Sequence, residues 1–371
     1  MSEEAASRIL VVRLSALGDV LFALPALRLL REARPAARIT FLVEDRFADL
    51  LLGHPDLDEL IVFRRKRIAR GDARAAIRLV RDLRSRRFDV ALDFQGNLKS
   101  GVLTRLSGAK RRIGFEPPAS REGNRFFTNR RVAPPEGVRW RPERDAALLR
   151  GLGIEPPQGP LRATPPRFGP EETDFAERAD GAAPGGGPLV IVHPGTSAFG
   201  AFKRWAPERH AALAEELVAR AGARVLVTHG PGELPLARAV AAAAAAGAVT
   251  IAPATRSLRE LAALLARADL VIGADTGPVH VAAVLGRPVI AIFGPKDPEI
   301  YRPLGEKTRV ARRDDVACSP CRLRYCPRPD CLEGLDPRPV LALALELLSG
   351  SRGREDARGA GSSRATAPPP R

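Results

Sequence analysis

The sequence is short of aromatic residues and of long apolar runs, and each shortage excludes a class of protein. Aromatic residues make up 5% of the 371 residues, and no known nucleic-acid-binding module is present, so no nucleic-acid partner is expected. No segment approaches the roughly 20 strongly apolar residues of a membrane span. The start, MSEEAASRIL, is acidic, and Arg13 soon interrupts the apolar run after it, which is not a signal-peptide pattern. We therefore expect a cytoplasmic protein that touches membranes only at their surface.

Lysine is also scarce, whereas arginine is abundant. Only six of the 59 basic residues are lysines, and the formal net charge is +16. Such an excess of basic residues favours anionic partners such as nucleotides or phosphorylated lipids. The charge is spread along the chain, which further disfavours a dedicated nucleic-acid binder.

Short β-branched runs alternate with helical patterns in both halves of the chain. The length favours two domains, and this alternation predicts an α/β protein with two doubly wound parallel sheets. A stretch rich in proline, glycine and acidic residues separates the halves. We therefore predict a first domain over 1–165, a linker over 166–188, a second domain over 189–349 and a disordered tail over 350–371.

The stretch RLSALGDV, residues 13–20, follows the apolar strand ILVV and opens the first helix. It has neither of the usual glycine-rich phosphate-binding patterns, and the carboxylate of Asp19 would repel a nucleotide phosphate. On the residues alone, two roles stay open. Either Ser15 or Asp19 caps the helix, or Asp19 is a general base that the helix N-terminus keeps ionised.

A second polar stretch, DTGPVH, lies where another predicted strand, DLVIG, gives way to a helix. A diphosphate at Asp275, Thr276 and Gly277 would accept backbone N–H groups at the helix start, and Gly277 would allow close approach. His280 lies one turn further on, where it either donates to the phosphate or is structural. Asp275 needs a neutralising partner beside a diphosphate, which leaves room for a stimulatory Mg²⁺.

In combination, five motifs make the chain resemble the family 9 glycosyltransferases, the bacterial lipopolysaccharide heptosyltransferases, from Ile9 to about Leu348. The resemblance implies a GT-B fold and inverting transfer of a heptose from ADP-L-glycero-D-manno-heptose to the Kdo/heptose inner core. The motifs are RLSALGDVLFALPAL, FDVALDFQGNLKSG, HPGTSAFGAFKRW, THGPGE and DTGPVHVAAVLGRPVIAIFGPKDP.

The resemblance also implies roles for individual residues. Asp19 would be the catalytic base, and Lys203 would hold the donor phosphate and stabilise the leaving diphosphate, although a lone lysine is otherwise more often solvated. Glu233 would bind the ribose hydroxyls. The full donor set is Thr196, Ser197, Lys203, Glu233, Asp275, Thr276, Gly277 and His280.

The acceptor is expected in the first domain. The basic run RRKRIAR, residues 64–70, follows a predicted strand, where it is either a solvated face or a site for phosphates and carboxylates. The resemblance implies a phosphorylated Kdo-lipid A or its monoheptosylated form as acceptor, at the cytoplasmic face of the inner membrane. The predicted acceptor residues are Ser15, Gly18, Arg64, Arg65, Lys66, Arg67 and Arg121.

All four cysteines lie in CSPCRLRYCPRPDC, at Cys318, Cys321, Cys326 and Cys331. Their C-x2-C-x4-C-x4-C spacing fits a structural zinc or iron–sulfur site, and free thiols in a folded loop stay an equal alternative. No cofactor is expected to be required for the reaction itself.

Two further readings of the whole chain stay open beside heptose transfer. One is a transferase of the same fold that uses another nucleotide sugar or a later core acceptor, because no single motif identifies the sugar. The other is a sugar-nucleotide 2-epimerase, which shares the two-domain architecture but would give the basic face of the first domain no purpose.

Overall fold

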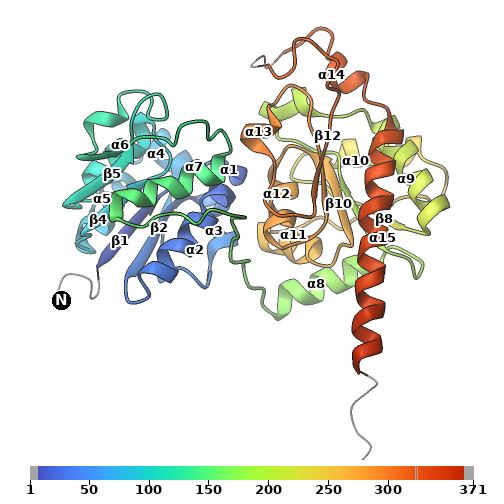
Figure 1. Ribbon diagram of the computed structural model, residues 1–371, viewed down its shortest axis with the longest axis horizontal. Helices are drawn as coiled ribbons and strands as arrows, with labels where there is room; N and C mark the ends of the chain where they lie inside the picture. The colour runs from blue at the N-terminus through green and yellow to red at the C-terminus, as the bar shows by residue number, and fades with distance from the viewer. Residues whose placement is uncertain (1–6, 322, 324, 363–371) are drawn as a thin grey trace, which may run out of the picture.

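The computed structural model describes residues 7–321, 323 and 325–362. Two six-stranded parallel sheets lie side by side in it (Figure 1). In spatial order the first sheet contains β3 (Glu59–Phe63), β2 (Arg38–Glu44), β1 (Arg8–Val12), β4 (Val90–Asp93), β5 (Arg111–Phe115) and β6 (Arg130–Val132). The second contains β12 (Thr308–Ala311), β11 (Val289–Ile292), β10 (Leu270–Ala274), β7 (Leu189–His193), β8 (Arg224–Val227) and β9 (Thr250–Ile251).

Both sheets have the same doubly wound topology. If the second sheet is counted from β7, its strands follow the order of the first sheet, in which the chain runs outward to one edge and then to the other. All five residues of β7 and of β10 are buried, as expected for parallel strands covered by helices on both faces. The predicted fold of two doubly wound α/β domains is confirmed.

Helices cover both sheets. Those of the first domain are α1 (Leu17–Phe22), α2 (Leu24–Ala33), α3 (Asp45–Leu51), α4 (Arg65–Ala69), α5 (Ala73–Ser85), α6 (Leu98–Leu106) and α7 (Arg141–Ala147), with 3-10 turns η1 (Asn124–Phe126) and η2 (Leu148–Leu152). The second domain contains α8 (Pro170–Gly181), η3 (Ala198–Lys203), α9 (Pro207–Ala221), α10 (Leu234–Ala243), α11 (Leu258–Leu265), α12 (Gly277–Val284), α13 (Pro298–Tyr301), α14 (Asp330–Glu333) and α15 (Pro337–Ser362). Among the described residues, none of these helices combines the length and apolar character that a bilayer crossing requires.

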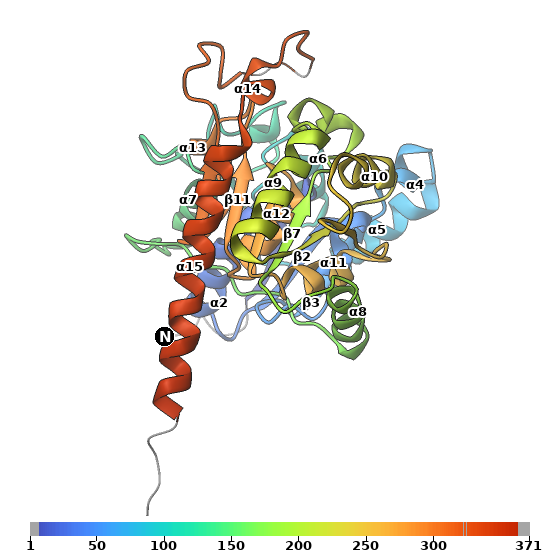
Figure 2. The same ribbon diagram turned by 90° about the vertical axis from the view of Figure 1, so that its right-hand side faces the viewer.

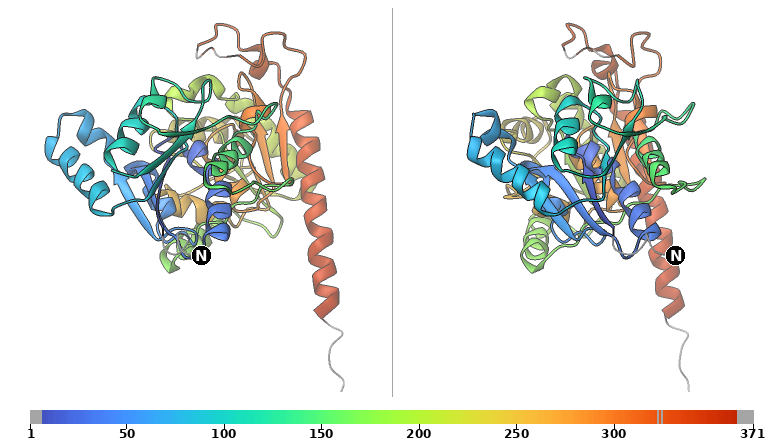
Figure 3. Two further views of the ribbon diagram at one scale, coloured as in Figure 1. Left: turned by 60° about the vertical axis from the view of Figure 1, so that its left-hand side comes forward. Right: turned by 90° about the vertical axis from the view of Figure 1, so that its left-hand side faces the viewer.

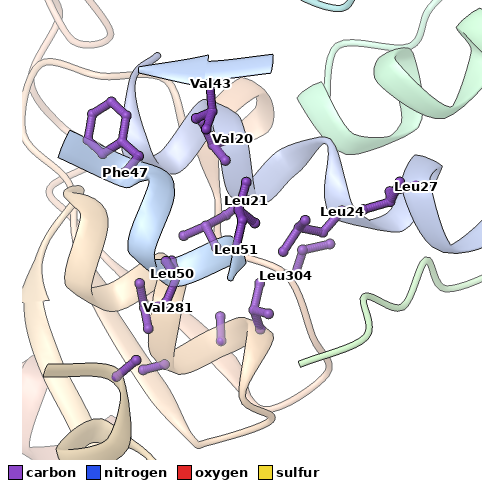
Figure 4. Packing of buried hydrophobic residues seen from close by; sticks show 14 of the residues in the cluster. Val20, Leu21, Leu24, Leu27, Val43, Phe47, Leu50, Leu51, Val281 and Leu304 are labelled. Atoms are coloured by element: carbon purple, nitrogen blue, oxygen red, sulfur yellow. The ribbon is translucent and has the colours of Figure 1, made fainter. Parts of the chain in front are cut away.

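The two domains share a continuous apolar core. Figure 4 shows Leu21 and Leu24 of the first domain and Leu50 of α3 packed near Val281 and Leu304 of the second. All five side chains are at least 96% buried. Burial of this kind is the main favourable contribution to folding, so the packing holds α1 against α12.

Two predicted boundaries differ from the structure. The predicted linker, 166–188, contains α8, which packs on α11 and pairs Glu172 with Arg259 at 2.7 Å. The domains are therefore connected through a packed helix, because acidic residues that suggested a solvated segment find arginine partners.

The predicted disordered tail covers 350–371, of which the structure describes 350–362. These residues continue α15, which packs on α9 and then runs past the second domain (Figure 2). Residues 363–371 lie outside the described residues.

Candidate active site

The candidate active site lies where α1 of the first domain meets α12 of the second. Glycines permit this approach, because a Cβ on Gly277 would lie 2.5 Å from Leu17 Cδ2, and one on Gly18 would lie 3.1 Å from His280 Cδ2. The Phe22 and His280 rings meet edge to face at 4.9 Å. The structure thus brings together the two stretches, RLSALGDV and DTGPVH, that the sequence placed in separate domains.

Asp19 lies in the first turn of α1, and its two carboxylate oxygens have different partners. Oδ2 accepts a hydrogen bond from the Ala16 amide at 3.4 Å, but the N-cap residue of α1 is Ala16, so neither Ser15 nor Asp19 occupies the predicted capping position. Oδ1 lies 3.2 Å from Arg141 and 3.6 Å from Arg13. Burial raises the pKa of Asp19, but Arg13 and Arg141 outweigh that effect and hold the pKa below its ordinary value. The carboxylate is therefore ionised at neutral pH, and 26% of its side chain is exposed.

A buried network of charged residues contacts Asp19 through Arg13. The guanidinium of Arg13 donates to the Asp19 carbonyl at 3.0 Å, to the Phe94 carbonyl and to Asp145 at 3.0 Å. Asp145 is fully buried and also lies 3.3 Å from Arg144. Sequence reasoning missed Asp145 and the arginines around it. Arg13 could have been found from the sequence, because it is a charged residue that directly follows a buried strand.

This network contains more arginine than carboxylate. Arg13, Arg141 and Arg144 face Asp19 and Asp145, and the Nε atoms of Arg141 and Arg144 are buried with no hydrogen-bond partner among the described residues. A buried donor without a partner is costly. The excess of positive charge therefore suits a further anionic group beside Asp19.

Asp275 joins Lys203 and His280 at the end of β10 in the second domain. Its carboxylate accepts from Lys203 Nζ at 2.7 Å and lies 3.1 Å from His280 Nε2, and its carbonyl also accepts from Lys203 at 2.7 Å. Burial raises the pKa of Asp275, but the hydrogen bond from His280 and the charge of Lys203 outweigh it and lower the pKa. Lys203 is therefore the neutralising partner that the sequence analysis left unassigned.

The N-terminus of α12 has no side-chain cap. Thr276 precedes the helix, but its hydroxyl donates to the Ala274 carbonyl at 3.2 Å and does not cap the helix amides. The amides of the first turn, next to Lys203, can therefore bind an anion. Backbone donors and a lysine converge at the end of β10.

Glu233, Thr196 and Ser197 lie at the ends of the neighbouring strands. Glu233 precedes α10, accepts from the Gly230 amide at 2.8 Å and lies 3.5 Å from His193 Nε2. Burial lowers the pKa of His193 to about 4, so this histidine is neutral at pH 7. Thr196 is buried and accepts from Arg204 at 3.0 Å, whereas Ser197 is exposed. Sequence reasoning missed His193, although it heads the motif HPGTSAFGAFKRW.

The predicted acceptor residues are not gathered into one group. Arg65 lies 3.8 Å from buried Glu44, and Arg67 pairs with Asp72 at 2.7 Å. For Arg64 and Lys66, no ion pair occurs within residues 7–321, 323 and 325–362. These residues lie on or next to α4, at the outer edge of the first domain (Figure 3).

Ser15 and Gly18 are close to Asp19 in the sequence, and hydrogen bonds of the loop after β4 link this stretch to Arg121. The Ser15 amide donates to Gln95 Oε1 at 3.3 Å, and the Arg121 amide donates to the Gly96 carbonyl at 2.8 Å. The loop after β4 thus connects the stretch around Asp19 to Arg121. Lys99 from the same region pairs with Glu44 at 3.0 Å and was not predicted.

Cys318, Cys321 and Cys326 lie between β12 and α14, in the loop at the top of the second domain in Figure 1, and Cys331 lies in α14 itself. All four are free thiols, and burial, together with the other three thiols, raises the pKa of Cys331. In the part of the chain that the structure describes, no group of three or more histidine, cysteine or acidic residues is arranged to hold a metal. The zinc or iron–sulfur site stays a prediction.

Known proteins resemble the chain over nearly its full length. A lipopolysaccharide heptosyltransferase 1 of Pseudomonas aeruginosa is 32% identical over 330 residues, covering 86% of this chain and 87% of that protein. The structure of the Escherichia coli heptosyltransferase WaaC with ADP matches with a TM-score of 0.73 at 28% identity, covering 92% of this chain and 99% of that one. A family 9 glycosyltransferase from Veillonella parvula, at 22% identity, shares the fold with a TM-score of 0.81 over 94% of this chain and 99% of that one.

The family assignment rests on a direct match as well as on these relatives. Residues 76–331 match the family described as glycosyltransferase family 9 (heptosyltransferase), and the motif-based resemblance is thereby confirmed. The chain belongs to glycosyltransferase family 9, the heptosyltransferases, and is a glycosyltransferase enzyme.

Proposed function

We propose that the enzyme transfers a heptose from ADP-L-glycero-D-manno-heptose to the Kdo/heptose inner core of lipopolysaccharide. The observation that carries this proposal is the contact between α1 and α12, because α1 contains the ionised Asp19 and α12 begins without a side-chain cap. Asp19 takes the proton of an acceptor hydroxyl, and the oxygen attacks the anomeric carbon of the donor. The bond to the diphosphate breaks as the new bond forms, so the anomeric configuration inverts.

The second domain holds the leaving diphosphate. Lys203 and the first amides of α12 face the position where negative charge develops, and His280 lies within the same turn. Glu233 would accept hydrogen bonds from the ribose hydroxyls. No resident cofactor has a step in this scheme, and stimulation by Mg²⁺ stays a prediction.

The acceptor is proposed to be an acidic sugar on a phosphorylated lipid. Arg13, Arg141 and Arg144 outnumber the two carboxylates that they face, and guanidinium groups pair well with carboxylates and phosphates. A Kdo carboxylate beside the attacking hydroxyl would balance this positive charge. Because such an acceptor is anchored in the inner membrane, we propose that the enzyme acts at the cytoplasmic face of that membrane.

Mass spectrometry of acceptors tests the proposal. The enzyme is incubated with ADP-heptose and either Kdo-lipid A or its monoheptosylated form. A mass gain of one heptose on either acceptor supports the proposal and gives the place of this enzyme in core assembly. Unchanged acceptors with an isomerised nucleotide sugar would instead favour the epimerase alternative, and unchanged acceptors with intact donor would favour another sugar or a later acceptor.

Replacing Lys203 by alanine should weaken use of the donor. The lysine supplies a charge-assisted hydrogen bond to the diphosphate, and losing such a bond costs about 1.5–3 kcal/mol, roughly a 10- to 150-fold loss in kcat/KM for the donor. Calorimetry of ADP binding and steady-state kinetics measure the effect. The matched control is Lys110→Ala, an exposed lysine of the first domain. Equal kcat/KM values for the two variants would contradict the role of Lys203.

Replacing Arg141 by glutamine should move the acid limb of the pH profile upward. Asp19 must be ionised to accept a proton, and its pKa is held below the ordinary 3.8 partly by Arg141. Without that charge the pKa rises, so activity is lost at a higher pH as the solution is acidified. Profiles of kcat/KM for the wild type and for an Arg78→Gln control check this. A limb that stays in place or moves to lower pH would contradict the pairing.

A further inference from the structure

A cavity of about 760 Å³ lies between the two domains, and it lies at the opposite end of the strands of the second sheet from the donor site. Arg287 lines it directly before β11, and residues 302–308 line it as they lead into β12. Asp275 and Glu233, in contrast, follow β10 and β8. Because all these strands are parallel, the cavity lies at their amino ends and is separate from the candidate active site.

Positive charge predominates in the lining of this interdomain cavity. Four basic side chains, Arg162, Arg287, Arg302 and Lys307, line it together with only two carboxylates, Glu143 and Glu306. For Arg162, Arg287 and Lys307, no ion pair is found among the described residues. The Nε atom of Arg287 is buried and has no hydrogen-bond partner there. An excess of basic side chains over carboxylates in the lining, three of them without an ion pair in this part of the chain, indicates a site for an anion.

The size and walls of the cavity indicate what kind of anion fits. Its volume is that of a small-molecule site, several times larger than one phosphate group needs. The half-buried Trp140 supplies a flat wall, and the guanidinium of Arg302 stacks on this ring at 4.6 Å. Arginines contributed from both sides of the domain junction would clasp a ligand with more than one negative charge.

We propose that this cavity binds a small phosphate-bearing molecule with at least two negative charges. Two consecutive residues, Trp140 and Arg141, connect the cavity to the candidate active site. Trp140 donates from Nε1 to the Arg302 carbonyl at 2.9 Å, while the next residue, Arg141, lies 3.2 Å from Asp19 and 5.4 Å from the Tyr301 ring. A ligand that holds Trp140 and Arg302 together therefore also holds Arg141 against Asp19.

Tryptophan fluorescence tests the binding, with inorganic pyrophosphate as the probe. The chain has two tryptophans, Trp140 at the cavity and Trp205, which is 99% buried and follows Lys203 by two residues, so Trp140→Phe decides which of them reports the binding. We expect a saturable change that disappears in Trp140→Phe. The double variant Arg162→Ser/Lys307→Ser should bind about tenfold more weakly or worse, because it loses two cationic partners. Both side chains are exposed, so the variant should fold, and its melting temperature verifies that.

Two controls assign the signal to the cavity. Arg78→Ser/Arg81→Ser removes two exposed arginines of α5 and should leave the affinity unchanged. Lys203→Ala weakens the donor site and should also leave the Trp140 signal unchanged. A signal that is absent at millimolar pyrophosphate, that is equal in the cavity and α5 variants, or that is lost only with Lys203→Ala would overturn the proposal.

The link to catalysis rests on the proposed role of Asp19 and has its own readout. At saturating donor, pyrophosphate should change kcat in the wild type and in the α5 control but not in the cavity variant. An equal response in all three proteins would remove the link. Binding measured through Trp140 is independent of activity, so its failure is distinguishable from failure of the proposed heptose transfer.

Discussion

Asp19→Asn is expected to lower kcat by about two to four orders of magnitude, the usual contribution of general-base catalysis, while ADP binding stays near that of the wild type. The amide has the same shape and can still accept from the Ala16 amide, but it cannot accept the acceptor proton. The donor contacts survive because Lys203 and Asp275 belong to the second domain. Steady-state kinetics with mass detection of the product measure kcat, and calorimetry measures ADP affinity.

The control for Asp19→Asn is Asp82→Asn. Asp82 lies on α5 of the same domain and has no ion pair within the described part of the chain, so its variant should keep full activity. The Asp19→Asn protein should also keep its fold, since Arg13 retains Asp145 as a partner at 3.0 Å. A kcat close to the wild-type value would show that another group accepts the proton. A loss of ADP affinity as large as the loss of kcat would show a structural role instead.

The sheets and their order could be predicted largely from the sequence, because parallel strands buried on both faces appear as short apolar runs such as LVIVH and DLVIG. Helices without an apolar face were harder to predict. Residues 65–69 form α4 although none of them is buried, and the continuation of α15 beyond residue 349 carries no clear apolar pattern. Local composition gives little signal where a helix makes few tertiary contacts.

Within the candidate site, the sequence could predict only those residues that directly follow a single strand. Asp19 and Asp275 were found because each follows a buried strand at the carboxyl edge of a sheet. Their partners come from distant parts of the chain: Arg141 reaches Asp19, and Lys203 reaches Asp275. Which basic residue of so arginine-rich a chain meets which carboxylate depends on how distant elements of the same domain pack together, and no local pattern contains that information.

Asp145→Ala is expected to destabilise the protein by about 3–5 kcal/mol, because it leaves buried charge without its partner. Arg13 is 99% buried and donates to Asp145 at 3.0 Å, and Arg144 lies 3.3 Å from the same carboxylate. Urea denaturation gives the free energy of unfolding. Activity should fall as well, since Arg13 also lies 3.6 Å from Asp19 and would be drawn closer to it.

Two comparisons make this stability prediction specific. Glu32→Ala breaks the exposed pair with Arg28, in which both side chains are at least 40% exposed, and should cost less than about 1 kcal/mol. Arg13→Met/Asp145→Leu replaces the buried pair with apolar side chains, and it should recover part of the stability lost in Asp145→Ala, because the buried charge of Arg13 is removed together with its partner and only Arg144 loses a carboxylate. That double variant should nevertheless remain poorly active, since Arg13 also holds the Asp19 carbonyl at 3.0 Å. If Asp145→Ala cost no more than Glu32→Ala, the buried network would not stabilise the fold. If the double variant were fully active, Arg13 would not position the catalytic carboxylate.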